Sequence, residues 1–170
     1  MTGFHRTYFD ILETIDECVK KDRITPALIL LYSAIDSFSK LSNKTGKGGR
    51  QVFQEWVKTY MLNKYPLPCN EADIYAARCA LLHTYTSESD LSKNSQAMEL
   101  YYVHGPKPIE PLQRAIASSP QTRSRVTAVR VEDLIRSFRN GMADCMSMIR
   151  NDSKWEKDFN EKVEKYLTVV

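Results

Sequence analysis

Three polar side chains stand close together in the stretch RCALLHTY, residues 78–85, at the end of a predicted helix. Arg78 supplies a permanent positive charge that suits phosphate oxygens, and His83 can accept or donate a proton near neutral pH. Tyr85 adds a hydroxyl group and an aromatic ring. A fixed cation and a proton-transfer group suit metal-independent cleavage of RNA, in which the RNA's own 2′-hydroxyl attacks the adjacent phosphate.

The spacing of these residues limits how they can meet on one helix. Arg78 and Tyr85 lie almost in line, but His83 lies about 140° around the axis from Arg78. Contact between Arg78 and His83 therefore needs a frayed helix, an arginine that reaches around the helix, or a second subunit. Cys79 and His83 do share a face, but nothing nearby suggests the third group that a thiol nucleophile needs.

The pattern Arg78-x4-His83 resembles the R-x4-H signature of the HEPN superfamily, helical bundles that include many metal-independent ribonucleases. The longer form R-x4-H-x-Y is typical of HEPN toxins paired with minimal nucleotidyltransferase antitoxins, and it is matched through Tyr85. The resemblance implies that Arg78 and His83 are catalytic. It also implies that Tyr85 lines the RNA cleft or accepts a nucleotide from a nucleotidyltransferase-type antitoxin; the alternative is a core or rim tyrosine.

One histidine cannot easily act as acid and base on opposite sides of the phosphorus. The resemblance implies a homodimer, in which two motifs meet across one cleft. We therefore expect a metal-independent endoribonuclease of HEPN type, a toxin or a defence effector. The alternative is a catalytically silent HEPN-like module that binds RNA, nucleotide or a partner protein. Cys79 favours this alternative, because active members commonly carry a polar residue after the arginine.

Asp36 lies within an apolar helical stretch, in YSAIDSFSK. Its carboxylate could orient Arg78 or His83 in the folded protein. The other interpretation is an i,i+4 ion pair with Lys40 on an exposed strip, and the local spacing favours that interpretation.

A run of arginines follows later in the chain: Arg114, Arg123, Arg125, Arg130, Arg136 and Arg139. Only Glu132 and Asp133 oppose them between Pro111 and Arg139. The guanidinium fork can donate two parallel hydrogen bonds to phosphate, so Arg123, Arg125 and Arg130 are candidates for binding RNA. The alternative is a solvated loop and helix face.

The composition suits one cytoplasmic globular domain. The 170-residue chain is 42% hydrophobic and 26% charged, with a net charge of +3. We expect no signal peptide and no membrane span. The cysteines (Cys18, Cys69, Cys79 and Cys145) and histidines (His5, His83 and His104) lack metal-ligand spacing, so we expect free thiols, no metal and no cofactor.

Hydrophobic periodicity predicts long helices at residues 7–21, 27–41, 50–63, 70–83, 131–150 and 153–167. Two strands, expected to be antiparallel, are predicted at 98–105 and 125–131, separated by three prolines and a short helical turn, LQRAIA, at residues 112–117. Residues 86–95 read as a loop, and helix caps are expected at Thr25 and at Asn70 with Asp73. The fold class is all-α: a single HEPN-like bundle over residues 1–170, with about five to six helices and a small two-stranded β insert at about 98–130.

Overall fold

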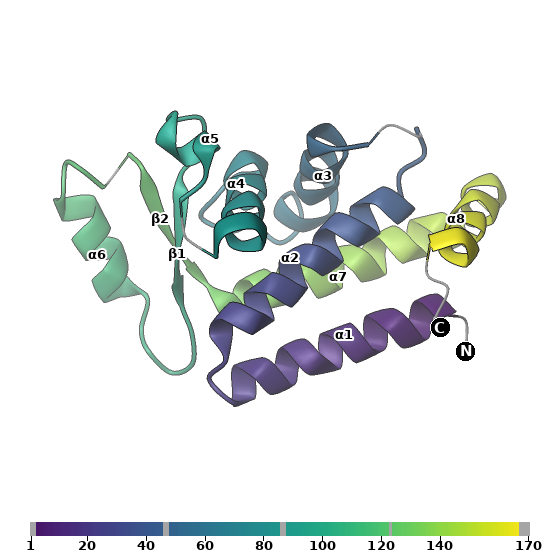
Figure 1. The fold of residues 1–170 in the computed structure, drawn as a ribbon, viewed down its shortest axis with the longest axis horizontal. Coiled ribbons are helices and arrows are strands. Elements are labelled where there is room, and N and C mark those ends of the chain that lie inside the picture. Colours follow the sequence, from purple (N-terminus) through teal and green to yellow (C-terminus); the bar gives the residue numbers. More distant parts are fainter. Residues whose placement is uncertain (1–2, 46–47, 86–87, 123, 167–170) are drawn as a thin grey trace.

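The computed structural model describes residues 3–45, 48–85, 88–122 and 124–166, and it is mostly helical (Figure 1). The elements run in the order α1 (Gly3–Lys20), α2 (Ile24–Leu41), α3 (Arg50–Trp56), the π-helical η1 (Val57–Leu62), α4 (Glu71–Thr84), α5 (Asp90–Lys93), β1 (Glu99–Val103), α6 (Glu110–Ser118), β2 (Val126–Arg130), α7 (Val131–Arg150) and α8 (Ser153–Tyr166). The expected all-α class with a small β insert is confirmed. The described part contains eight α-helices rather than five or six: α5 was not expected, and α6 contains the short helical turn that was expected at LQRAIA, residues 112–117.

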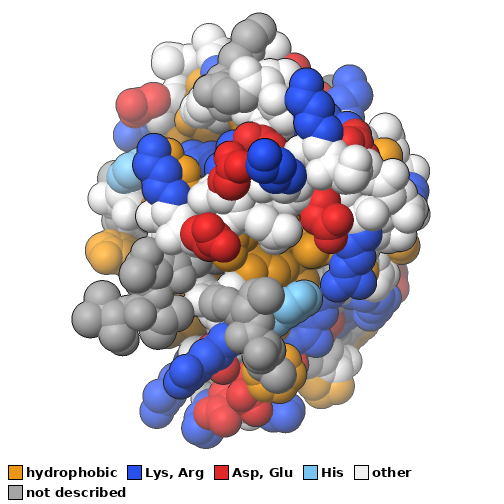
Figure 2. Space-filling view, turned by 90° about the vertical axis from the view of Figure 1, so that its right-hand side faces the viewer, with side chains coloured by type: hydrophobic (Ala, Val, Ile, Leu, Met, Phe, Trp, Pro, Cys, Tyr) orange, Lys and Arg blue, Asp and Glu red, His pale blue; other side chains and the backbone are white. Residues whose placement is uncertain are grey.

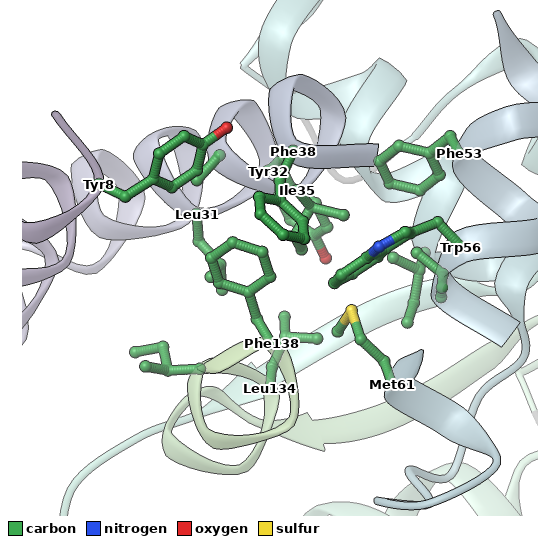
Figure 3. Packing of buried hydrophobic residues seen from close by; sticks show 14 of the residues in the cluster. Tyr8, Leu31, Tyr32, Ile35, Phe38, Phe53, Trp56, Met61, Leu134 and Phe138 are labelled. Atoms are coloured by element: carbon green, nitrogen blue, oxygen red, sulfur yellow. The ribbon is translucent and has the colours of Figure 1, made fainter. Parts of the chain in front are cut away.

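The helix α2 is central, with α1 and α4 among the elements that pack on it. Its buried face carries Leu31, Ile35 and Phe38. Phe38 meets Trp56 of α3 with ring centroids 5.4 Å apart, and Trp56 meets Phe138 of α7 at 5.9 Å. Figure 3 shows these rings between the helices that contribute them. The most apolar predicted helix is therefore the one that holds the others together.

By length and composition alone, α2 could also cross a membrane, since an 18-residue window has a mean hydropathy of 1.2. Half of that window is buried inside the fold and it lies near the N-terminus; the core helix of a soluble protein and a signal sequence pass the same test of length and composition.

The two strands are parallel, so the expected antiparallel pairing was wrong. Glu99 pairs with Val126, and the register continues to Val103 opposite Arg130. The connecting residues 104–125 contain α6, and a crossover of this length lets the second strand run in the same direction as the first. The sheet lies on the helices as expected: β1 packs against α4, and the hydroxyls of Tyr32 and Tyr102 are 2.6 Å apart.

The predicted cap of α4 is confirmed. Asn70 accepts from the backbone of Asp73, and the Asp73 carboxylate accepts from the backbone of Asn70. The cap predicted at Thr25 was wrong, because α2 begins at Ile24. Pro26 is compatible with this start, since the first backbone N–H groups of a helix have no partner within it.

The loop expected at residues 86–95 contains the short helix α5. Its start is fixed by a second capping box, in which Ser89 and Ser92 accept from each other's backbone. Residues 86–87 lie outside the described part. The four cysteines are all free, Cys145 buried and the other three half-buried.

Candidate active site

The structure brings Asp36, Arg78 and His83 together. Arg78 Nη2 lies 3.0 Å from Asp36 Oδ2, and Arg78 Nη1 lies 3.3 Å from His83 Nε2. Asp36 comes from α2 and the other two residues from α4, which packs against α2. One guanidinium therefore bridges a carboxylate on the central helix and an imidazole near the end of the neighbouring helix.

The arginine reaches around the helix to make this contact. The helix α4 continues to Thr84, so His83 is still in helical backbone and no fraying is involved. The spacing left three ways for Arg78 to contact His83: a frayed helix, a long arginine side chain or a second subunit. The arginine side chain makes the contact within one chain. The side chains of Arg78 and Asp36 are only 18% and 16% exposed, whereas His83 is exposed. The arrangement thus presents the imidazole to solvent and keeps the supporting ion pair mostly covered.

Asp36 contacts both expected partners at once, but not on an exposed strip, since its side chain is mostly covered. The same oxygen, Oδ2, accepts from Arg78 and, at 2.7 Å, from Lys40 of the same helix. Burial by itself would lower the pKa of Arg78. The charge of Asp36 and hydrogen bonds to Cys79 and Asp36 raise that pKa above its ordinary value, so the guanidinium stays charged.

The Arg78–His83 contact also constrains the imidazole. Arginine has donors and no acceptor, so a hydrogen bond between Nη1 and Nε2 requires Nε2 to accept. A neutral His83 in this contact carries its proton on Nδ1. A phosphate that draws the guanidinium toward itself would leave the Nε2 lone pair of His83 free to take a proton.

Cys79 lies beside the arginine, with Sγ 4.0 Å from Arg78 Nη1. It also interacts with the hydroxyl of Tyr75, whose pKa is raised first by burial and then by the neighbouring thiol. The Cys79 side chain is half-buried. The thiol thus packs beside the guanidinium.

Tyr85 ends α4 in a conformation that is uncommon for a tyrosine. Its φ and ψ are 55° and 29°, the left-handed region, in which helices usually end on glycine. Tyr85 is 73% exposed, so it is not a core tyrosine. The helix therefore ends on an aromatic side chain that points to solvent, two residues after His83.

A hollow of about 590 Å³ adjoins the ion pair, and sequence analysis did not find it. Its described lining is Ser33, Asp36, Ser37, Lys40, Leu41, Asn43, Gly48, Arg78, Leu82, Lys162 and Tyr166. These residues come from α2, the segment after it, α4 and α8, so no local motif marks them. Of these residues, the sequence predicted only Asp36 and Arg78 as site residues, and Lys40 only as an ion-pair partner of Asp36.

Two of the predicted RNA-binding arginines, Arg125 and Arg130, do not line this site. Arg125 is exposed and lines a small hollow with Asn70 and Asp73, at the start of α4. At about 1.5 Å per residue, that start lies roughly 20 Å along the helix from His83.

Arg130 donates from Nη1 to the backbone oxygen of Gly105 and from Nη2 to that of Lys107, both at 2.8 Å. These hydrogen bonds stabilise the turn that follows β1. Arg123 lies outside the described residues. On the face seen in Figure 2, acidic and basic side chains are intermixed among the described residues.

Within the described ranges, no group of three or more histidine, cysteine or acidic residues could hold a metal ion. No protein-family model, no curated protein and no solved structure matches the chain. The described molecule is thus a mostly helical bundle with a small parallel sheet and an exposed histidine held against an anchored arginine.

Proposed function

We propose that the chain is a metal-independent endoribonuclease of HEPN type. The observation that carries the proposal is the Arg78–His83 contact of 3.3 Å, with Asp36 holding the other side of the guanidinium. An exposed proton-transfer group beside a fixed, charged donor matches what cleavage by the RNA's own 2′-hydroxyl requires.

The reaction breaks one bond to phosphorus and forms another. The 2′-oxygen bonds to phosphorus, the bond from phosphorus to the 5′-oxygen breaks, and the products are a 2′,3′-cyclic phosphate and a 5′-hydroxyl. Arg78 binds a phosphate oxygen and stabilises its growing negative charge. One His83 takes the proton of the 2′-hydroxyl, and a protonated His83 supplies one to the leaving 5′-oxygen.

These two roles call for two histidines, so the active species in this proposal is a homodimer. Its interface includes the end of α4, where His83 and Tyr85 are exposed. Light scattering at micromolar concentration should give twice the chain mass. A strict monomer would remove the two-histidine mechanism.

The exposure of Tyr85 supports a role outside the core. In the cleft its ring can stack on a base, and in a toxin pair its hydroxyl would be the acceptor of nucleotide from a cytoplasmic nucleotidyltransferase antitoxin. Nucleotide phosphates attached there would block RNA near Arg78 by bulk and by charge. A toxin or a defence effector is the setting that this motif suggests.

The second candidate is a catalytically silent HEPN-like module that binds RNA, nucleotide or a partner protein. Cys79 favours it, since this thiol packs beside the guanidinium where a polar group is common in active members. A wild-type protein that binds RNA and leaves it uncut would establish this alternative.

The test is RNA cleavage by purified protein in excess EDTA, with structured and unstructured RNA. His83→Ala should lower the rate roughly a hundredfold to ten-thousandfold, because a general acid or base is lost. Arg78→Ala should act similarly by removing charge stabilisation. The matched control is His5→Ala, which removes another exposed histidine, on α1. Equal cleavage by the wild type and both site variants would end the nuclease proposal.

A further inference from the structure

The hollow between α2, α4 and α8 has the chemistry of a ligand site. Among its described lining residues, three side chains are cationic (Lys40, Arg78 and Lys162) and one, Asp36, is a carboxylate. Its volume of about 590 Å³ falls within the usual range for small-molecule sites. The lining thus carries a net positive charge in a concave surface, where an anion is attracted more strongly than on an open face.

Its remaining lining is mixed in a way that suits a nucleoside. Leu41 and Leu82 provide apolar surface, and Tyr166 provides an aromatic ring that is 64% exposed. Ser33, Ser37 and Asn43 bring hydroxyl and amide groups to the same hollow. Apolar walls with a few polar groups are typical of sites that hold a base and a sugar.

The lysines can still donate to a ligand. The side chain of Lys40 is 52% exposed, and its hydrogen bond of 2.7 Å to Asp36 uses one of the three donors of the ammonium group. Lys162 donates to the backbone oxygen of Asn43 and to Asp158, and an ammonium has a third donor. The contacts with Asp36, Asn43 and Asp158 hold both ammonium groups in place at the hollow.

Arg78 connects the hollow with His83. Its guanidinium lines the hollow, and its Nη1 is 3.3 Å from His83 Nε2. A phosphate bound at Arg78 therefore has the imidazole on one side and the hollow on the other. The next nucleotide of the same strand can enter the hollow without leaving the site.

We propose that this hollow binds one nucleotide of the RNA substrate, the neighbour of the phosphate that is cut, with Lys40 and Lys162 contacting its phosphate. The inference rests on the proposed ribonuclease activity. Another hollow, of about 420 Å³, has the opposite balance of charge. Its charged lining residues are three carboxylates and two cations: Glu13, Asp16, Glu17, Lys20 and Arg139. Its excess of carboxylates disfavours a phosphate.

The test is binding of each of the four nucleoside 3′-monophosphates to the full chain, followed by calorimetry and by NMR. The monophosphates should bind more tightly than the nucleosides and than inorganic phosphate. Lys40→Met and Lys162→Met should each weaken binding by about tenfold or more, because each removes a charge-assisted hydrogen bond. In RNA cleavage the same variants should raise KM more than they lower kcat.

Matched controls remove a lysine of the same kind elsewhere. Lys21→Met breaks an i,i+4 pair between Lys21, which follows α1, and Glu17 of α1, as Lys40→Met breaks one on α2. Lys157→Met changes the same helix as Lys162→Met but lies outside the hollow. Lys162→Arg keeps the charge and should keep most of the binding, which separates lost charge from disturbed folding.

The proposal is overturned if the monophosphates bind no more tightly than inorganic phosphate. It is equally overturned if Lys40→Met and Lys162→Met bind as the two controls do. RNA cleavage that depends on His83, without mononucleotide binding, removes this site and leaves the nuclease standing. Lysine-dependent binding of monophosphates by a protein that cuts no RNA removes the nuclease and supports the nucleotide site.

Discussion

The two ends of α4 differ in how their polar side chains are placed: buried and bonded to backbone at the start, exposed at the end. At the first end, Asp73 is fully buried and accepts from two backbone N–H groups, of Asn70 at 2.9 Å and of Met98 at 2.6 Å. At the other end, His83 is exposed and Tyr85 closes the helix in a left-handed conformation with its ring in solvent.

The difference separates groups that the fold needs from groups that it does not. The polar atoms of Asp73 close the helix start and fix the chain ahead of β1. Among the described contacts, His83 meets Arg78 and does not pair with the backbone at the helix end, as Asp73 does. Tyr85 is in a left-handed backbone conformation, which costs about 1 kcal/mol for an L-residue. Polar side chains that stability does not explain are the ones to test for function.

The largest effect on stability is expected at the buried end. Asp73→Ala leaves the N–H groups of Asn70 and Met98 without the buried carboxylate that accepts from them, and a hydrogen bond to a charged group contributes about 1.5–3 kcal/mol. Chemical denaturation should show a loss of roughly 2–5 kcal/mol. Glu71→Ala, in the same helical turn but paired only at 3.9 Å with Lys58, should cost less than about 1 kcal/mol. Equal losses would contradict the contrast between the two carboxylates.

A smaller effect on stability, with an effect on rate, is expected at Asp36. Asp36→Asn keeps the shape of the side chain but removes the charge that holds Arg78. Because the pair is mostly covered, its loss should cost about 1–2 kcal/mol, between the values for exposed and buried pairs. Cleavage of RNA should fall by about tenfold to a hundredfold, since a misplaced guanidinium stabilises less charge. Unchanged cleavage would show that the arginine needs no anchor.

Local patterns predicted local structure well. The apolar stripe of Leu134, Phe138, Met142, Cys145 and Ile149 predicted a helix at 131–150, and α7 has these bounds, with Met142 half-buried and the other four buried. The spacing of Asn70 and Asp73 predicted the capping box. These features depend on residues within a few positions of each other, which a sequence displays directly.

Features that join distant segments were harder to predict. The direction of β2 depends on how residues 104–125 cross over, and the strand residues themselves are the same for either pairing. The contact of Asp36 with Arg78 spans 42 residues, so it was only an alternative to the local pair with Lys40. Lys162 joins the hollow from α8, and no spacing in the sequence places it there.

Tyr85 offers a test in which a site residue is replaced to gain stability. Glycine has no Cβ and adopts φ near 55° without strain, so Tyr85→Gly should raise stability by about 0.5 kcal/mol. That gain corresponds to a rise in Tm of about 1–2 °C for a chain of this size. Tyr85→Ala keeps the Cβ and should give no such gain. A loss of stability in the glycine variant would mean that the tyrosine ring packs on something that stabilises the fold.

The smallest effect on stability is expected at His83, the counterpart of Asp73 on the same helix. His83→Ala removes an exposed ring whose described bond is to Arg78, and that guanidinium keeps Asp36 as its partner. Changes at exposed positions usually stay within about 0.5 kcal/mol, so the denaturation midpoint should hardly move. The same variant is expected to lose most of the RNA cleavage. His83→Ala should therefore lower activity without lowering stability, whereas Asp73→Ala should lower stability. Unfolding of His83→Ala would make the histidine structural and would turn its match to the R-x4-H pattern into a coincidence.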